Sequence, residues 1–374
     1  MGQQVDFGVF LPVTNNGWII SNTSPQFLPS FAHNREIAQL AERIGFSYVF
    51  SMAKWRGFGG QVEFWKYSIE SMILMTGLAS TAPTLRLIAS IAPALMHPAV
   101  FAKMAVTMDD VSGGRMGFNI VSAGNKGEYT QMGLWPERFE DYRYEYCEEW
   151  ASVVKRLWTE DSVTFNGKHF HLDDCQSWPH PVQNLPPIVC ATTSERGWQF
   201  VAQHCTAALF GGKDQKKISR RIKEVAAEHG RSDVRTHTLI NLVQGDSDAD
   251  AQRILRHYQD GADHEAIENI YRLRVREKDA MRADQLRGRF ESNLNRLFYA
   301  GIPFVGGPER VASMIEELAI DGDLDGFLFI FPDFVEGLAK FDAQVMPLLR
   351  QRGLGRLTPP FAAAPTHAPA RALM

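Results

Sequence analysis

Residues 111–136 read VSGGRMGFNIVSAGNKGEYTQMGLWP, and this pattern predicts the end of a helix, a glycine turn, a short strand and a polar loop. Residues 112–114, Ser-Gly-Gly, predict the end of a helix and a chain reversal, because glycine tolerates positive φ. Residues 115–122 then predict a short buried strand that contains one polar residue, Asn119. A loop with four functional side chains follows: Asn125, Lys126, Glu128 and Tyr129. Enzymes with alternating strands and helices keep their active sites in such loops.

The same alternation extends over most of the chain. Apolar runs predict strands at residues 5–11, 48–52, 85–91, 115–122, 187–191, 207–210, 238–243 and 326–331. Helical spacing or capping signals predict helices at 30–45, 69–82, from Pro98, at 143–158, after Ser194, from Ala249 and at 334–349. Eight strands separated by helices favour a closed (β/α)8 TIM barrel of class α/β, with a doubly wound sheet as the second choice.

Three segments depart from the alternation. Residues 163–170 predict a hairpin that turns at Asn166-Gly167. The charged residues 264–295 contain no predicted strand, so we expect a helical insertion at about 262–300, near the mouth of the barrel. Residues 356–374 are rich in proline and alanine and predict a disordered tail. The expectation is therefore one domain over residues 1–355.

Composition excludes several classes of protein. The 374 residues are 45% hydrophobic and 22% charged, as in a soluble globular protein. A net charge of −4 argues against a nucleic-acid partner. No apolar run reaches the ~20 residues that cross a membrane, and residues 1–6 do not resemble a signal peptide. The four cysteines lack metal-binding spacing and are expected to be reduced, which together predicts a cytoplasmic protein.

Five segments together resemble a known family. They are FLPVTNNGWIIS at 10–21, SMAKWRGFGGQVEFW at 51–65, QMGLWP at 131–136, RYEY at 143–146 and IVCATTS at 188–194. The chain resembles the bacterial-luciferase-like flavin-dependent monooxygenases, and among them the pyrimidine oxygenases that open the uracil ring. The resemblance covers residues 5–260 and resumes at 306–349. It implies a homo-oligomer, either a dimer or a tetramer.

The resemblance implies an FMN site at the mouth of the barrel. The residues that match the family's FMN contacts are Ala53, Lys54, Asn119, Glu128, Arg143, Tyr144 and Ser194. Five of them have a structural alternative: a solvated lysine at Lys54, a core amide at Asn119, a surface charge at Glu128, an ion pair of Arg143 with Glu145, Glu148 or Glu149, or a plain helix cap at Ser194. The chain has no G-x-G-x-x-G after a strand, which agrees with reduced FMN arriving from a separate NAD(P)H:flavin reductase.

The implied reaction uses O2 and reduced FMN, which form a flavin peroxide that attacks a small-molecule substrate. In the pyrimidine oxygenases an amide C–N bond of the ring then breaks. Donors beside the carbonyl oxygen would stabilise its developing charge, and the candidates are Asn119, Asn125 and Lys126. His97 is a further candidate acid or base. The expected pocket walls are Trp18, Met52, Trp55, Phe58, Phe64 and Gly124.

The loop also contains a departure from the pyrimidine oxygenases. Their Thr-Gly-Trp-Gln-Lys run is Ser-Ala-Gly-Asn-Lys at 122–126, so Gly124 replaces a large aromatic residue. Ala53, Pro93 and His97 also differ in character from the family's residues. Changes of this size can reassign a substrate. Oxygenation of a sulfone, sulfonate or other organosulfur compound is therefore the alternative function; a deazaflavin-dependent reductase and a flavin-storage protein are weaker ones.

No metal site is predicted. His169, His171 and Asp173 could form one, but an exposed hairpin edge is the better interpretation of these residues.

Overall fold

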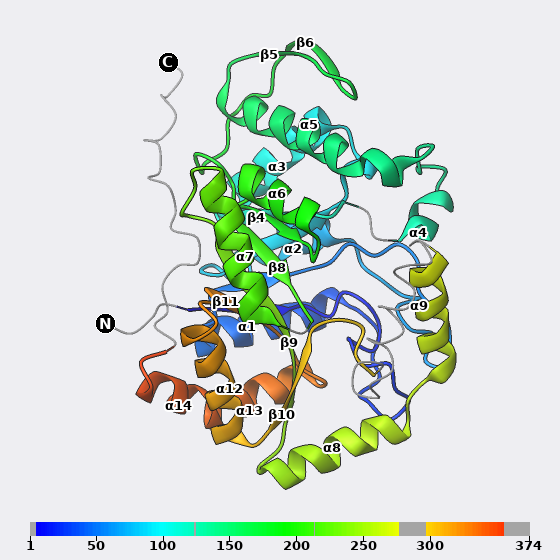
Figure 1. The fold of residues 1–374 in the computed structure, drawn as a ribbon, viewed down its shortest axis with the longest axis vertical. Coiled ribbons are helices and arrows are strands. Elements are labelled where there is room, and N and C mark those ends of the chain that lie inside the picture. The colour runs from blue at the N-terminus through cyan, green and yellow to red at the C-terminus, as the bar shows by residue number, and fades with distance from the viewer. Residues whose placement is uncertain (1–4, 123–124, 213, 277–296, 355–374) are drawn as a thin grey trace.

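Eight parallel strands form a closed barrel at the centre of this computed structural model, which describes residues 5–122, 125–212, 214–276 and 297–354 (Figure 1). In pairing order they are β1 (Asp6–Phe10), β2 (Tyr48–Phe50), β3 (Arg86–Ile91), β4 (Met116–Ile120), β7 (Ile188–Ala191), β8 (Ala207–Phe210), β9 (Arg235–Gln244) and β11 (Gly326–Ile330). β8 pairs with β9, and β11 pairs with β1, so the ring closes. The predicted TIM barrel is confirmed, and the doubly wound sheet is wrong.

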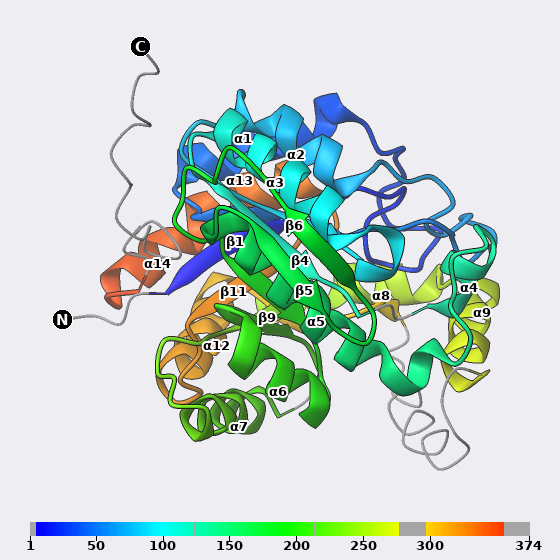
Figure 2. The same cartoon turned by 90° about the horizontal axis from the view of Figure 1, so that it is seen from above.

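Helices surround the barrel, as the view from above shows (Figure 2). They are α1 (Phe31–Ile44), α2 (Ser71–Ala79), α3 (Pro98–Ser112), α5 (Phe139–Thr159), α6 (Glu195–His204), α7 (Gln215–Glu228), α12 (Pro308–Ile320) and α13 (Phe334–Gln344). Their ends follow the sequence signals. Gly45 ends α1 at φ 92°, Pro98 opens α3, and Ser194 caps α6 by accepting a hydrogen bond from the Gly197 N–H.

The region after β9 agrees with the prediction in its helices but contains one strand that was not predicted. α8 (Asp248–Asp260) and α9 (His264–Arg276) are helical, and residues 277–296 of the expected insertion lie outside the described chain, as does the expected tail. No strand was predicted at β10 (Ile302–Gly306), which pairs with β9 from Ile240 to Gln244, beyond the end of β8. A strand was not predicted there because proline argues against a strand and because the segment lacks a continuous run of buried apolar side chains.

Three smaller predictions were also wrong in detail. β5 (Val163–Asn166) and β6 (His171–Cys175) form the hairpin, but its turn is a four-residue loop at 167–170, because Asn166 still pairs with His171. The polar loop after β4 contains a short helix, α4 (Lys126–Thr130), and the 3-10 helix η1 (Pro93–Leu95) follows β3. The last predicted helix divides into α13 and α14 (Met346–Gln351), because Pro347 cannot continue a helix.

A cluster of buried polar side chains occupies the amino-terminal end of the barrel, opposite the mouth. The Arg235 guanidinium lies 2.9 Å from Asp6 Oδ2, and His237 Nε2 lies 3.5 Å from the same oxygen. Tyr48 Oη is 3.0 Å from His237 Nδ1. Burial raises the pKa of Asp6 to about 7, although Arg235 opposes the shift. Burial also holds the pKa of His237 well below its ordinary value.

The raised pKa of Asp6 predicts a pH-dependent stability. Because the folded pKa lies above the unfolded value of 3.8, the contribution of Asp6 is fully present below that value and is lost as pH rises through about 7. The shift corresponds to roughly 4 kcal/mol. Urea unfolding from pH 5 to pH 8 should show Asp6→Asn gaining stability relative to the wild type as pH rises. Asp233→Asn is the control, because it removes an exposed carboxyl whose pKa is lowered. The difference in unfolding free energy between Asp233→Asn and the wild type should therefore not change from pH 5 to pH 8. If the difference for Asp6→Asn does not change either, the prediction is wrong.

Candidate functional site

The carboxyl ends of β2, β4 and β7 bring together most of the residues predicted to bind a cofactor. Ala53 and Lys54 follow β2, Asn119 lies in β4, and Glu128 lies in α4 just beyond it. Ser194 follows β7. The strand order β2-β3-β4-β7 places these segments side by side at one part of the mouth. Sequence motifs up to about 140 residues apart therefore converge on one region.

Lys54 and Glu128 form a buried ion pair at this mouth. The Lys54 ammonium contacts Glu128 Oε1, and the two side chains are only 4% and 8% exposed. The other carboxylate oxygen, Oε2, accepts a hydrogen bond from the backbone N–H of Trp55 at 2.9 Å. Glu128 thus holds both the charge of Lys54 and the loop that carries it. The solvated-lysine and surface-charge alternatives are wrong for this pair.

Aromatic rings enclose the Lys54 ammonium. Its nitrogen lies 4.1 Å from the centroid of the Phe58 ring and 5.4 Å from that of Trp65. These contacts are cation–π interactions, which strengthen when water is excluded. Behind them the rings of Trp18, Phe64 and Tyr299 pack against Trp65. Trp18 and Phe64, both predicted pocket walls, are buried in this aromatic cluster.

Asn119 connects three neighbouring strands of the barrel. Its Nδ2 donates to Ser90 Oγ in β3 at 2.8 Å, and its Oδ1 accepts from the Ala191 N–H in β7 at 3.1 Å. Asn119 is buried, so these bonds also satisfy a polar group that would otherwise be costly. The core-amide alternative therefore describes its present contacts, and a ligand could share only its remaining hydrogen-bonding capacity.

A cluster of three hydroxyls, from Tyr144, Thr192 and Ser194, lies at the amino terminus of α6. Tyr144 Oη is 3.1 Å from Ser194 Oγ and 3.5 Å from Thr192 Oγ1. The guanidinium carbons of Arg143 and Arg196 lie 5.3 and 5.9 Å from the Tyr144 ring centroid. Hydroxyl donors, guanidinium groups and a helix amino terminus are all suited to a phosphate. Arg143, Tyr144 and Ser194 are among the residues predicted to bind FMN, whereas Thr192 and Arg196 are not.

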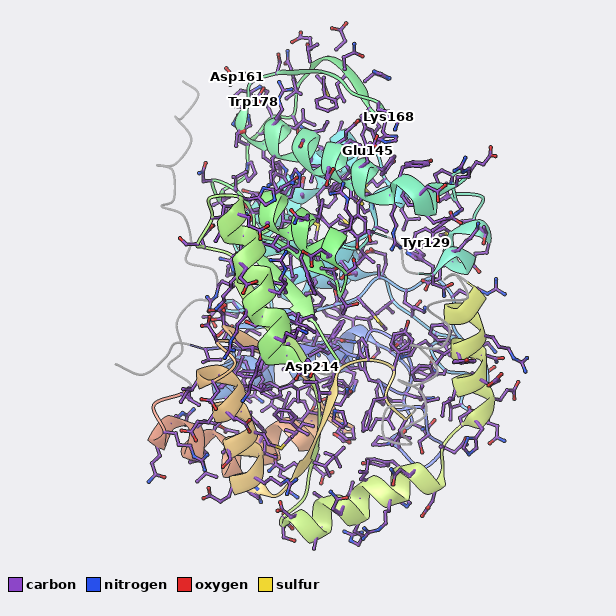
Figure 3. The ribbon with its side chains drawn as sticks, in the orientation of Figure 1. Tyr129, Glu145, Asp161, Lys168, Trp178 and Asp214 are labelled. Carbon is purple, nitrogen blue, oxygen red and sulfur yellow. The ribbon has the colours of Figure 1, made fainter. Side chains whose placement is uncertain are left out.

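The acidic residues beside Arg143 on α5 are engaged with other groups. Glu148 pairs with Arg196, Glu145 pairs with Lys168, and Glu149 accepts hydrogen bonds from the backbone of the hairpin loop. Figure 3 labels Glu145 and Lys168, on α5 and on the hairpin above it. His169 is not at an exposed edge: it stacks on Tyr142 and contacts Glu145. The hairpin is thus fastened to α5 by these acids.

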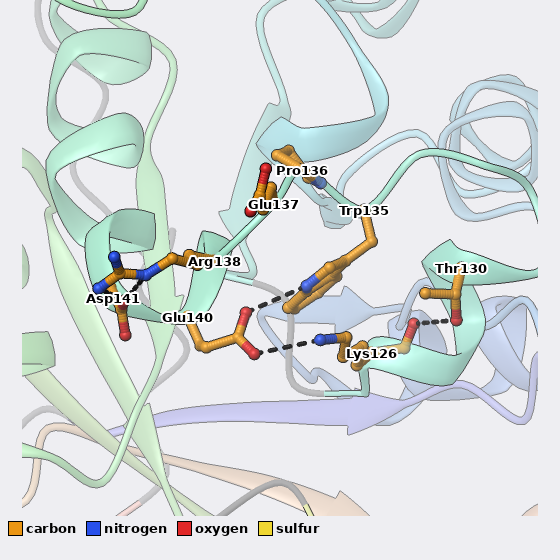
Figure 4. A pocket seen from close by; sticks show the side chains of 8 residues that line it. All are labelled: Lys126, Thr130, Trp135, Pro136, Glu137, Arg138, Glu140 and Asp141. Carbon is orange, nitrogen blue, oxygen red and sulfur yellow. Dashed lines mark hydrogen bonds and ion pairs between the residues drawn. The ribbon is translucent and has the colours of Figure 1, made fainter.

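The predicted donors Asn125 and Lys126, and the predicted acid or base His97, make other contacts. Asn125 caps α4 by accepting from the Gly127 N–H. Lys126 pairs with Glu140 at 3.2 Å in an open hollow of about 570 Å³ that Trp135 also lines (Figure 4). His97 is exposed, caps α3 and packs edge-on against Phe170. The structure therefore does not bring these three side chains to the Lys54–Glu128 pair.

The remaining predicted pocket residues lie on the segment after β2. Met52 and Ala53 are partly buried, Trp55 is exposed, and Phe58 is buried under the Lys54 ammonium. Gln131 Nε2 donates to the Trp55 carbonyl at 2.8 Å, which ties this segment to the loop after α4. Gly124 lies outside the described residues. Trp55, at 39% exposure, is thus the most exposed of the predicted aromatic wall residues.

Solved structures with the same barrel are monooxygenases and related enzymes. Long-chain alkane monooxygenase LadA superposes with a TM-score of 0.82 over 96% of this chain and 94% of its own, at 20% identity. Riboflavin lyase RcaE, solved with modified FMN and riboflavin, gives 0.82 over 98% and 94%, at 22% identity. EDTA monooxygenase from Chelativorans gives 0.82 over 96% and 97%, at 18% identity. At these identities the likeness establishes the TIM-barrel fold.

The sequence comparison identifies the family. A sequence model described as luciferase-like monooxygenase matches residues 5–323, and the chain belongs to this family of flavin-dependent monooxygenases. Pyrimidine monooxygenase RutA of Caulobacter vibrioides is 38% identical over 354 residues, which cover 92% of this chain and 98% of that protein. RutA of Acinetobacter baylyi is 36% identical over 352 residues, which cover 92% and 95%. The family resemblance is confirmed.

Proposed function

We propose that this flavin-dependent monooxygenase uses reduced FMN and O2 to oxygenate or open a small heterocyclic ring with an amide group, as a pyrimidine has. The observation that carries the proposal is the buried Lys54–Glu128 pair at the mouth of the barrel. Two charges are costly to bury, and a buried ion pair at the mouth of a barrel, where such enzymes keep their active sites, marks a candidate functional site. The relatives named pyrimidine monooxygenase support the substrate class.

The side chains at the mouth fit FMN. The hydroxyls of Tyr144, Thr192 and Ser194, with Arg143, would hold the phosphate at the amino terminus of α6. Lys54, Ala53, Asn119 and Glu128 would border the flavin ring, with Glu128 acting mainly by holding Lys54. When bound, reduced FMN supplies the electrons that activate O2. The aromatic cluster behind Lys54 would exclude water from that region.

The substrate would bind near the accessible ring of Trp55, beside Lys54. The Lys54 ammonium is a donor that could stabilise negative charge on a ring carbonyl oxygen, together with Asn119. Asn125, Lys126 and His97 would take part only after leaving their present partners, so we give them lesser roles. Gly124 would leave more room beside the substrate than the family's aromatic residue.

We also propose that a separate NAD(P)H:flavin reductase supplies the reduced FMN, which agrees with the absence of a G-x-G-x-x-G motif from the sequence. Assembly into a dimer or tetramer stays a prediction, as does the cytoplasmic location. Among the helices of the described residues, none has the length and apolar character needed to cross a membrane.

A turnover screen tests the proposed function. The protein is incubated with FMN, a generic flavin reductase, NADH and ¹⁸O2, and uracil, other N-heterocycles or small sulfones are added in separate reactions. We expect a ring-opened product of a pyrimidine or related heterocycle that contains one ¹⁸O atom, detected by mass spectrometry. A labelled sulfone product alone would establish the organosulfur alternative instead. If all consumed oxygen is recovered as hydrogen peroxide and every substrate persists, the proposed substrate class is wrong.

A further inference from the structure

The loop of residues 57–65, next to Lys54, has an unusual backbone. Gly59 and Gly60 have φ of 73° and 78°, and the non-glycine residues Glu63 and Trp65 have φ of 46° and 60°. Residues with side chains rarely adopt this region, and they persist in it only where surrounding contacts fix the chain. The rings that enclose the Lys54 ammonium, Phe58 and Trp65, both belong to this loop.

One set of contacts fixes the loop from the segment after β1. Asn15 Nδ2 donates to the carbonyls of Val62 and Glu63 at 3.2 and 3.1 Å. Asn16 Nδ2 also donates to the Val62 carbonyl, at 3.0 Å. The indole N–H of Trp65 donates to the carbonyl of Gly17 at 2.6 Å. These bonds hold the carbonyl side of the turn and one of its rings.

A second contact comes from a buried aspartate that the sequence analysis did not single out. Asp263 precedes α9, and each of its two carboxylate oxygens accepts a hydrogen bond from a different backbone N–H. Oδ2 accepts from the Val62 N–H at 2.9 Å, and Oδ1 accepts from the Ala266 N–H, in the first turn of α9, at 3.1 Å. A Cβ at Gly60 would lie 2.5 Å from Oδ2, so this approach requires glycine there.

The rest of α9 follows the same loop. One turn after Ala266, Asn269 Nδ2 donates to the Phe58 carbonyl at 2.9 Å. Ile267 and Ile270 belong to the same apolar cluster as Phe58 and Val62. The loop 57–65 therefore contacts α9 through its backbone, and its Phe58 and Trp65 rings contact the Lys54 ammonium.

We infer that Asp263 is a positioning residue for the active site. It fixes the strained loop 57–65 to α9, so that the rings of Phe58 and Trp65 stay against the Lys54 ammonium. Asp263 touches neither Lys54 nor the proposed flavin position, and acts only through the loop. The inference rests on the proposed function to the extent that Lys54 is proposed to border the flavin.

The placement of Lys54 can be measured without flavin or substrate. Lys54 is nearly inaccessible, so its acetylation by an excess of an N-hydroxysuccinimide ester, followed by mass spectrometry, reports how often the loop opens. We expect Asp263→Ala to raise the labelling rate of Lys54 at least about tenfold, because the Val62 N–H and α9 both lose their partner. Asp263→Asn keeps one acceptor oxygen and should give an intermediate rate. Asp333→Ala is the control, since Asp333 also caps a helix, α13, where its side chain accepts a hydrogen bond from the Glu336 N–H.

Asn269→Ala provides a milder variant if Asp263→Ala does not fold, because it removes only the bond to the Phe58 carbonyl. It should raise Lys54 labelling by about threefold, as expected for loss of one partly buried hydrogen bond. Labelling of Lys54 that is unchanged in these variants, or that rises equally in Asp333→Ala, would overturn the inference.

The affinity for FMN, measured by quenching of its fluorescence, separates the inference from the proposed function. We expect Asp263→Ala to weaken FMN binding and Asp333→Ala to leave it unchanged. If Lys54 labelling rises but FMN affinity does not change, the positioning role of Asp263 stands. In that case the proposed contact between Lys54 and the flavin is wrong.

Discussion

Replacing Glu128 with alanine should destabilise the protein and weaken FMN binding at least about tenfold. The substitution leaves the Lys54 ammonium buried without its carboxylate, and it removes the acceptor of the Trp55 N–H. Breaking one partner of a buried ion pair costs about 3–5 kcal/mol. Because Lys54 and the Trp55 segment both move, the affinity for FMN should fall at least about tenfold, or about 1.4 kcal/mol. Urea unfolding and flavin titration measure the two effects.

A matched control ion pair lies at the end of the loop 57–65. Lys66 and Glu63 form an ion pair of the same residue types, but their side chains are 55% and 48% exposed. An exposed pair contributes about 0–1 kcal/mol, so Glu63→Ala should change both measurements little. If Glu128→Ala and Glu63→Ala behave alike, burial does not give the Lys54–Glu128 pair its importance.

A double variant distinguishes stability from function at this pair. Replacing both partners with apolar side chains, as Lys54→Met with Glu128→Leu, removes the unpaired charge and should recover much of the stability lost in Glu128→Ala. It should not recover FMN binding, because the ammonium is gone. Recovery of both would mean that the pair only holds the fold, and the proposal for Lys54 would then be wrong.

The barrel could be predicted from the sequence because its signals are local. Each buried strand is a short apolar run, and the residues that end or begin the helices, such as Gly45, Pro98 and Ser194, act within one turn of the chain. β10 is different, because it becomes a strand only by pairing with the far half of β9. Its own sequence, with a proline at its second position, does not specify that partner.

The candidate site could be predicted as a set of residues but not as a set of contacts. Lys54 and Glu128 are 74 positions apart, and only the closed barrel shows that they bind each other rather than solvent. The same holds for Thr192 and Arg196. They become candidate site residues only because they contact Tyr144, which lies on a helix far away in the sequence. Lys126 has the right chemistry in the right loop, yet the short helix α4 directs its side chain to Glu140. The direction of a side chain within one helical turn therefore decides whether Lys126 can reach the site, and the sequence pattern does not specify that direction.

The hydroxyl cluster leads to the second large expected effect. Gly197 lies in the first turn of α6, and a Cβ there would overlap Thr192 Oγ1 and lie 2.9 Å from Tyr144 Oη. Alanine is favoured over glycine in a helix by about 1 kcal/mol, so Gly197→Ala should not weaken α6 itself. It should instead displace Thr192 and Tyr144 from Ser194 and obstruct the proposed phosphate position. We expect FMN affinity to fall at least about tenfold, because a phosphate held by several charge-assisted bonds loses more than one of them.

Gly337→Ala is the matched control, because a Cβ at Gly337 in α13 would lie 2.7 Å from the Phe331 ring, far along the chain from the hydroxyl cluster. Both substitutions add one methyl group to a crowded helical glycine, so both can lower the unfolding free energy. Only Gly197→Ala should weaken FMN, and it should weaken riboflavin, which has no phosphate, much less. Equal losses for FMN and riboflavin would place the phosphate elsewhere. Equal losses in Gly197→Ala and Gly337→Ala would mean that strain in the barrel, and not the hydroxyls of Tyr144, Thr192 and Ser194, governs flavin binding.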